Sequence, residues 1–139
     1  MAIHHMGLVA RDPAAAERFY SRHFGFRRAR VIGEGTGQIL FLKADGFYLE
    51  VFHANGDSPV AAPMGVGPEY PGWRHLAFQV DDVDRFVAAM GDDARITAGP
   101  MSFDDFIPGW RTVWVADPDG NIVEISQGYV DQENPPAGR

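Results

Sequence analysis

The sequence predicts an α+β fold of two tandem βαβββ modules. In each half a histidine precedes an aspartate by seven residues, and an Asp-Gly pair precedes a glutamate by four. Apolar residues around these positions alternate in strand-like runs, and one helix-like segment follows the first strand of each half. The repeated residues are His5, Asp12, Asp45-Gly46 and Glu50 in the first half, and His75, Asp82, Asp119-Gly120 and Glu124 in the second.

The first half begins with a predicted strand over residues 3–9. Asp12 is a suitable N-cap and Pro13 a suitable first helical residue, so a helix is expected to begin there and to end at Gly25. Three further strands are expected near residues 29–33, 38–43 and 47–53, the last two joined by a hairpin at the Asp-Gly pair.

The second half repeats this order. A strand over residues 74–80 leads to a cap at Asp81 or Asp82, and apolar residues spaced three and four apart predict a helix that Gly91 ends. Strands are expected near 95–98, 112–116 and 122–127, with a turn at residues 117–120 before the last.

These elements divide the chain into four regions. The modules are expected at residues 1–53 and 74–128. Four prolines and four glycines break up the intervening stretch, residues 54–73, which reads as a linker. Residues 129–139 contain little apolar side chain beyond their first two positions and are expected to form a flexible tail.

Composition narrows the class of partner. The chain has 139 residues, 45% of them hydrophobic, which suits a globular protein with a sizeable core. Its net charge of −7 disfavours nucleic acid and anionic membranes as partners. A small-molecule substrate is expected from the pocket described below. No stretch is long and apolar enough for a membrane span or a signal peptide, which leads us to expect a cytoplasmic location.

Strand alternation puts the repeated histidines and glutamates on one side. Leu49 and Val51 flank Glu50 and point to the opposite side, as Leu76 and Phe78 do on the strand of His75. We therefore expect a curved antiparallel sheet forming a cup, with helices on its convex side and the polar quartet in the cup. Aromatic side chains expected to wall it are Tyr48, Phe52, Tyr70, Trp73, Phe103, Phe106 and Trp110.

The quartet predicts a metal site. Two imidazoles and two carboxylates suit a divalent ion such as Ni, Zn, Co, Mn or Fe, and the chain has no cysteine to offer instead. The predicted metal ligands are His5, Glu50, His75 and Glu124. A single histidine or glutamate on a strand is more often structural, so the prediction depends on the repeat.

Three segments together resemble the vicinal oxygen chelate superfamily, which includes glyoxalase I, bleomycin resistance proteins and extradiol dioxygenases. They are the stretch from His5 to Tyr20, the run from His75 to Asp82, and the turn from Asp117 that leads to Glu124. The resemblance covers residues 3–127. It implies paired βαβββ modules, usually in a dimer, whose cup forms within one chain or across two.

The resemblance to glyoxalase I implies a metal-dependent lyase or isomerase that transfers a proton next to a carbonyl, on a substrate with vicinal oxygens. It assigns Glu124 as the catalytic base, with Glu50 as the second candidate. Two alternatives remain: an Fe(II) extradiol-type dioxygenase, and a non-catalytic protein that binds a small molecule such as an antibiotic. Val9 and Ala54 occupy positions where bacterial glyoxalases carry glutathione-binding residues, so glutathione dependence is not predicted.

Overall fold

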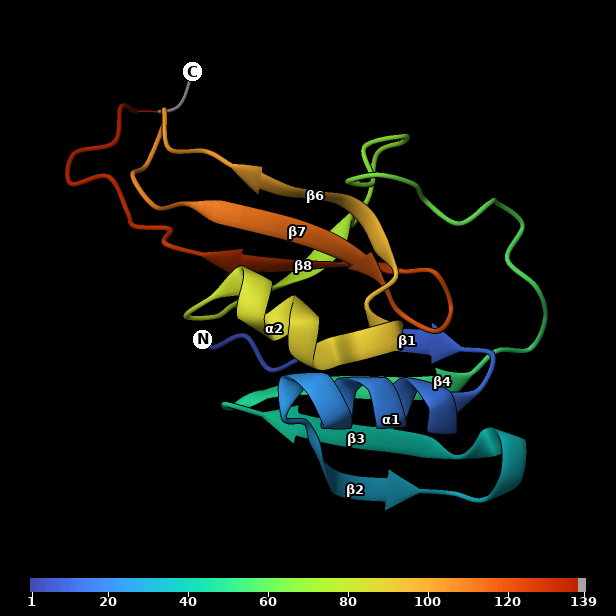
Figure 1. Ribbon diagram of the computed structural model, residues 1–139. Coiled ribbons are helices and arrows are strands. Elements are labelled where there is room, and N and C mark those ends of the chain that lie inside the picture. Colours follow the sequence, from blue (N-terminus) through green and yellow to red (C-terminus); the bar gives the residue numbers. More distant parts are fainter. Residues whose placement is uncertain (138–139) are drawn as a thin grey trace.

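The predicted tandem βαβββ arrangement is confirmed by a computed structural model that describes residues 1–137 (Figure 1). The first module contains β1 (His5–Ala10), α1 (Pro13–Phe24), β2 (Arg27–Ile32), the short 3-10 helix η1 (Gly35–Gly37), β3 (Ile39–Ala44) and β4 (Phe47–His53). The second contains β5 (His75–Gln79), α2 (Val83–Met90), η2 (Gly91–Asp93), β6 (Ile96–Ser102), β7 (Arg111–Ala116) and β8 (Ile122–Gln127).

Both helices begin and end at the residues that the sequence predicts. Asp12 caps α1 by accepting a hydrogen bond from the amide of Ala14 at 3.0 Å, and Asp82 caps α2 by accepting one from Arg85 at 2.9 Å. Gly25 ends α1 with a φ of 72°, a left-handed conformation that glycine adopts without steric cost.

Each module has its own four-stranded sheet, ordered β1-β4-β3-β2 and β5-β8-β7-β6. The sheets are mixed, and the expectation of wholly antiparallel pairing is corrected, because β1 pairs parallel with β4 and β5 with β8. The direction of the chain explains this. A helix returns the chain after the first strand, so the second strand runs like the first, the third runs oppositely, and the fourth runs like the first again.

One strand is longer than the sequence suggests. The pattern places a strand near residues 95–98, whereas β6 continues to Ser102, through Gly99 and Pro100. Register shifts between Ile96 and Ala98 and between Ala98 and Met101 accommodate these residues. A Cβ at Gly99 would lie 2.9 Å from the carbonyl oxygen of Thr112 on β7, so the bulge needs glycine there.

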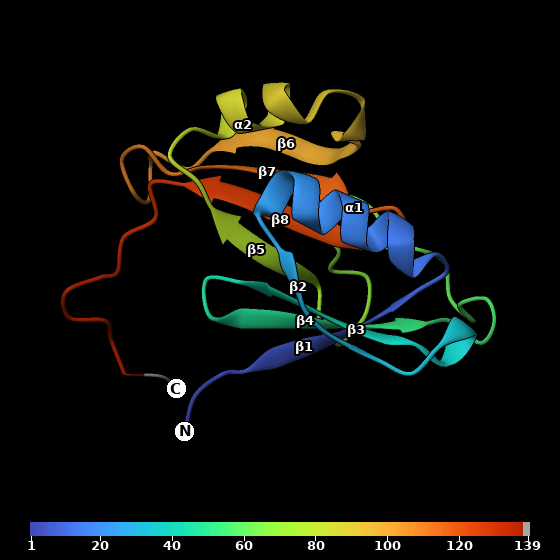
Figure 2. The ribbon, with the colours of Figure 1, turned by 90° about the horizontal axis from the view of Figure 1, so that it is seen from below.

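A single hydrophobic core joins the modules. Leu49 and Val51 from the first sheet and Val123 and Ile125 from the second are at most 2% exposed and belong to one cluster with apolar residues of both helices. Within it, the ring of Phe24 at the end of α1 stacks on Phe78 of β5 at a centroid distance of 4.2 Å. Both helices lie in front of the sheets in Figure 1 and above the sheets that they cover in Figure 2.

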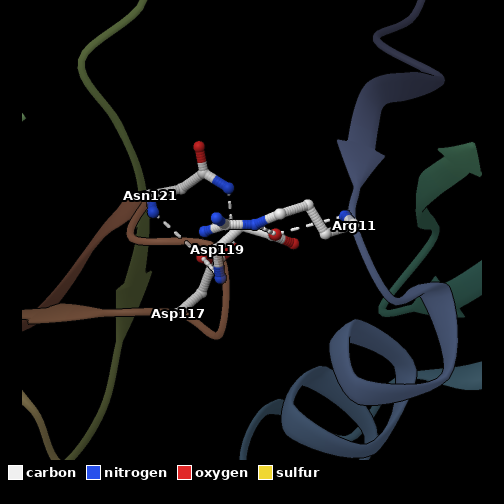
Figure 3. A network of polar contacts seen from close by, with 4 residues as sticks. All are labelled: Arg11, Asp117, Asp119 and Asn121. Atoms are coloured by element: carbon white, nitrogen blue, oxygen red, sulfur yellow. Dashed lines mark hydrogen bonds and ion pairs between the residues drawn. The ribbon is translucent and has the colours of Figure 1, made fainter. Parts of the chain in front are cut away.

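A polar cluster around the turn between β7 and β8 also ties the modules together (Figure 3). Asp117 is 1% exposed and accepts hydrogen bonds from the amides of Asp119 and Asn121, the side chain of Asn121, and the hydroxyl of Tyr20 on α1 at 2.9 Å. Arg11, after β1, donates from its backbone amide and Nε to Asp119, each at 3.1 Å. Two residues of the first module thus bind one turn of the second.

The connection between β4 and β5, residues 54–74, contains no helix or strand. The last two residues of the predicted tail 129–139 lie outside the described residues. Among the residues described, no helix is long and apolar enough to cross a membrane.

Candidate functional site

In the first module the structure brings together His5 of β1 and Glu50 of β4. Parallel pairing sets Gly7 opposite Glu50, and His5 lies two residues before Gly7 on the same face of the strand. The imidazole of His5 therefore reaches diagonally toward β4, and its Nε2 lies 3.4 Å from Oε2 of Glu50. The side chains are 43% and 21% exposed. His4 supports the imidazole, with its Nδ1 2.8 Å from Nδ1 of His5.

In the second module His75 of β5 and Glu124 of β8 form the equivalent pair. Ala77 is paired with Glu124, the same register as Gly7 with Glu50, and Nε2 of His75 lies 2.7 Å from Oε2 of Glu124. This pair is more enclosed, at 19% and 15% exposed. The indole N–H of Trp114, which is opposite Glu124 on β7, donates to the same carboxylate oxygen at 3.2 Å.

The hydrogen bonding of His75 is incomplete among the described residues. The contact with Glu124 requires the proton on Nε2, which leaves Nδ1 as an acceptor. Nδ1 is buried and has no hydrogen-bond partner among the described residues. A buried polar atom without a partner is uncommon in folded proteins. If Nε2 instead bound a cation, the proton would move to Nδ1, which would then lack an acceptor instead of a donor. The unpaired atom therefore does not distinguish a metal ligand from a structural histidine.

The spacing within each pair fits neighbouring ligands of one cation. Bonds of roughly 2.0–2.2 Å from nitrogen or oxygen to a divalent ion, at right angles, put the two donors about 3 Å apart. The observed separations of 3.4 and 2.7 Å lie on either side of that value.

The single chain does not bring the two pairs together. Within residues 1–137, no three side chains of the types His, Cys, Asp and Glu are grouped as one cation would require. The apolar residues beside Glu50 and Glu124 fill the shared core, so each pair lies on the side of its own sheet that faces away from the helices.

Beside Glu124 lies a hollow of about 260 Å³, lined by Ala77, Gln79, Ser126, Trp110 and Tyr129 among others. Of the aromatic residues expected to wall a pocket, Trp110 lines this hollow. Phe103 packs against the ring of Trp110, with 4.8 Å between the two ring centroids. Trp73 and Phe106, at 91% and 78% exposed, do not. Trp114 was not foreseen, because only the register of β7 against β8 places it at Glu124.

Sequence comparison supports the family assignment. Residues 2–125 match the family described as the Glyoxalase/Bleomycin resistance protein/Dioxygenase superfamily. The uncharacterized protein YaeR of Escherichia coli (strain K12) is 30% identical over 131 residues, which cover 88% of this chain and 93% of that protein.

Solved structures agree with this assignment. A glyoxalase family protein from Enterococcus faecalis is 29% identical with a TM-score of 0.68, covering 90% of this chain and 96% of that one. Lactoylglutathione lyase from Agrobacterium tumefaciens is 26% identical with a TM-score of 0.59, covering 91% and 93%. The chain belongs to the Glyoxalase/Bleomycin resistance protein/Dioxygenase superfamily.

Proposed function

We propose that this protein is a metal-dependent lyase or isomerase of the glyoxalase type, which transfers a proton next to a carbonyl on a substrate with two adjacent oxygens. The observation that carries the proposal is the repeated histidine and glutamate pair. Both modules hold the pair in the same register, with donor atoms spaced as neighbouring ligands would be. The relative named as lactoylglutathione lyase supports this reaction class.

His5, Glu50, His75 and Glu124 are the proposed ligands of a divalent ion, Ni, Zn, Co, Mn or Fe. Nitrogen and carboxylate donors without thiolates suit these ions. When bound, the ion supplies Lewis-acid polarisation of the substrate carbonyl, which acidifies the neighbouring C–H.

Glu124 is the proposed base that removes and returns the proton, with Glu50 as the second candidate. Trp114 and His75 both contact Oε2 of Glu124, which fixes the orientation of the carboxylate. Oε1 accepts no hydrogen bond from the residues that the structure describes, so it is the oxygen left to take the proton.

Because the pairs are separate in one chain, we propose a homodimer in which the first-module pair of one copy meets the second-module pair of the other. A symmetric dimer would then contain two equivalent sites. Exposed apolar side chains lie next to both pairs: Ile3 and Trp73, each two residues before a proposed histidine ligand, are 87% and 91% exposed, and Val9 beyond Gly7 is 60% exposed. Such residues are typical of an interface.

One observation favours a second candidate, an Fe(II) extradiol-type dioxygenase. Glu50 is held less closely than Glu124, because its distance to the paired histidine is the longer of the two and no described side chain donates to it as Trp114 does to Glu124. Loss of Glu50 as a ligand would leave two histidines and one carboxylate, the set that non-haem iron oxygenases use. Iron in the purified protein and oxygen uptake with a catechol would identify this reaction.

A subunit-mixing experiment tests the proposed site. One chain carries His5→Gln and Glu50→Gln, the other carries His75→Gln and Glu124→Gln, and different affinity tags allow isolation of the mixed dimer. Metal content is measured after purification without chelator. In the proposed arrangement the mixed dimer keeps one intact site of two, so we expect about half the wild-type metal per dimer.

The parent variants, each purified alone, serve as controls and are expected to lose nearly all metal. A site built within one chain would leave the mixed dimer as empty as its parents, which would contradict the dimeric arrangement. Wild-type protein without stoichiometric metal would contradict the proposed function and favour a non-catalytic binding protein.

A further inference from the structure

The hollow beside Glu124 differs from the matching place beside Glu50 in the first module. Phe52, two residues beyond Glu50, lies over Gly7, with Cε2 3.7 Å from where a Cβ of Gly7 would be. In the second module the matching position is Ser126, so the space over Ala77 is open.

The wall of the hollow is held in place before any ligand arrives. Trp110 donates its indole N–H to Oγ of Ser126 at 3.0 Å, and Ser126 shares a hydrogen bond of 2.9 Å with Thr112. The backbone of Trp110 also closes the loop, since its carbonyl accepts from Phe103 at 2.8 Å. Gly128 packs so closely on the Gly109 carbonyl that no side chain would fit there. A fixed wall lowers the conformational cost of binding.

Apart from Glu124, the described residues that line the hollow are aromatic, apolar or neutral polar. The rings of Trp110 and Tyr129 lie 5.9 Å apart at 69°, in an edge-to-face arrangement, and Ala77 provides a small apolar surface. Among the described residues that line the hollow, Glu124 is the one carboxylate, and none is an arginine or lysine that could pair with a carboxylate or phosphate of a ligand. A cavity of about 150 Å³ holds benzene, so about 260 Å³ has room for one aromatic ring.

We propose that this hollow binds an uncharged, planar apolar substituent of the substrate, about the size of a phenyl ring, next to the two oxygens that approach Glu124. The inference rests on the proposed function and narrows its substrate class. The substrate is an aryl-substituted or similarly flat α-oxygenated carbonyl compound, rather than one recognised here through an anionic tail.

Two hydroxamates test the proposal by calorimetry on the Ni²⁺-loaded protein. Acetohydroxamate and benzohydroxamate both present vicinal oxygens to a metal, and they differ by a methyl and a phenyl group. The ratio of the benzohydroxamate to the acetohydroxamate binding constant is measured for the protein and divided by the same ratio for Ni²⁺ in water. We expect benzohydroxamate to bind at least about tenfold more tightly after this correction, because the phenyl ring leaves water.

Ala77→Leu fills the hollow and is expected to abolish this preference while acetohydroxamate binding and nickel content stay unchanged. Ala77 is exposed on an edge strand, so a larger side chain does not press on the core. Ala29→Leu is the matched control, because Ala29 is also exposed but lines a different hollow, on the first sheet with Arg30 and Tyr48. It is expected to keep the preference.

Acetohydroxamate binding without a preference for benzohydroxamate would overturn this inference and leave the proposed function standing. The same holds if Ala77→Leu keeps the preference. Failure to retain nickel and to bind either hydroxamate would overturn the proposed function, and the inference with it.

Discussion

The two modules share one backbone plan and differ in the side chains around their carboxylates. Opposite Glu50 on the neighbouring strand stands Phe41, which has no hydrogen to donate, whereas Trp114 stands opposite Glu124 and donates to it. The pair beside Phe41 is more exposed and more widely spaced. Repetition has thus kept the histidine and glutamate side chains and their register, while among the described residues only the carboxylate of the second module is held by a donor on the neighbouring strand.

The turns before the last strands differ as well. In the first module Asp45 and Gly46 form a tight turn, both with positive φ, and the Asp45 side chain accepts no hydrogen bond from the described residues. In the second module the longer turn buries Asp117, which binds Tyr20 of the first module. The turn of the second module therefore contributes to the contact between the modules through Asp117, whereas the turn of the first module does not do so through Asp45.

The largest effect is expected from Asp117→Asn. Asp117 accepts four hydrogen bonds through its two carboxylate oxygens. In asparagine one of these oxygens becomes an NH₂ group, which would face two donors instead of accepting from them, and the buried negative charge is lost. We expect a loss of about 2–4 kcal/mol in the free energy of unfolding, measured by urea denaturation. Asp45→Asn, the same change in the first module, should cost less than about 0.5 kcal/mol. Equal losses would show that the two turns are equivalent.

Features that depend on neighbouring residues in the chain were predictable from the sequence, whereas features that depend on how the strands pair were not. Helix ends were predictable from Asp12, Gly25 and Asp82 because capping depends on neighbours in the chain. The two histidine and glutamate pairs were predictable from strand alternation within a repeat. The role of Trp114 depends on which residue of β7 meets Glu124, and that register is a tertiary property. Parallel pairing of β1 with β4 also depended on the full path of the chain.

The next largest effect is expected from Trp114→Phe, which makes the second module resemble the first at Phe41. Loss of the N–H leaves His75 as the one described side chain that still holds Oε2 of Glu124, and the loss of such a hydrogen bond beside a metal ligand typically weakens metal binding. We expect metal affinity to fall about tenfold in competition with a chelator. Trp110→Phe is the matched control, since it removes an indole donor to Ser126 on the same sheet without touching Glu124. Equal effects of both variants would refute the specific role of Trp114.

The smallest effect is expected from Tyr20→Phe, and its pH dependence makes it specific. Burial, followed by the charge of Asp117 and the hydrogen bond to it, raises the pKa of Tyr20 well above its ordinary value. Below about pH 10 we expect the variant to lose about 1 kcal/mol, because one hydrogen bond to Asp117 is gone.

Above that pH the unfolded chain ionises its tyrosine while the folded protein does not, so the wild type loses stability as pH rises. Tyr20→Phe removes this contribution, and its unfolding free energy should approach that of the wild type between pH 10 and 11, measured by urea denaturation at each pH. Tyr129→Phe is the comparison: the pKa of Tyr129 is also raised, chiefly by its hydrogen bond to Asp131, but its side chain is about half exposed and screened by solvent, so this variant should keep most of the alkaline loss. If Tyr129→Phe removed the alkaline loss of stability and Tyr20→Phe did not, the contact between Tyr20 and Asp117 would not be the cause of that loss.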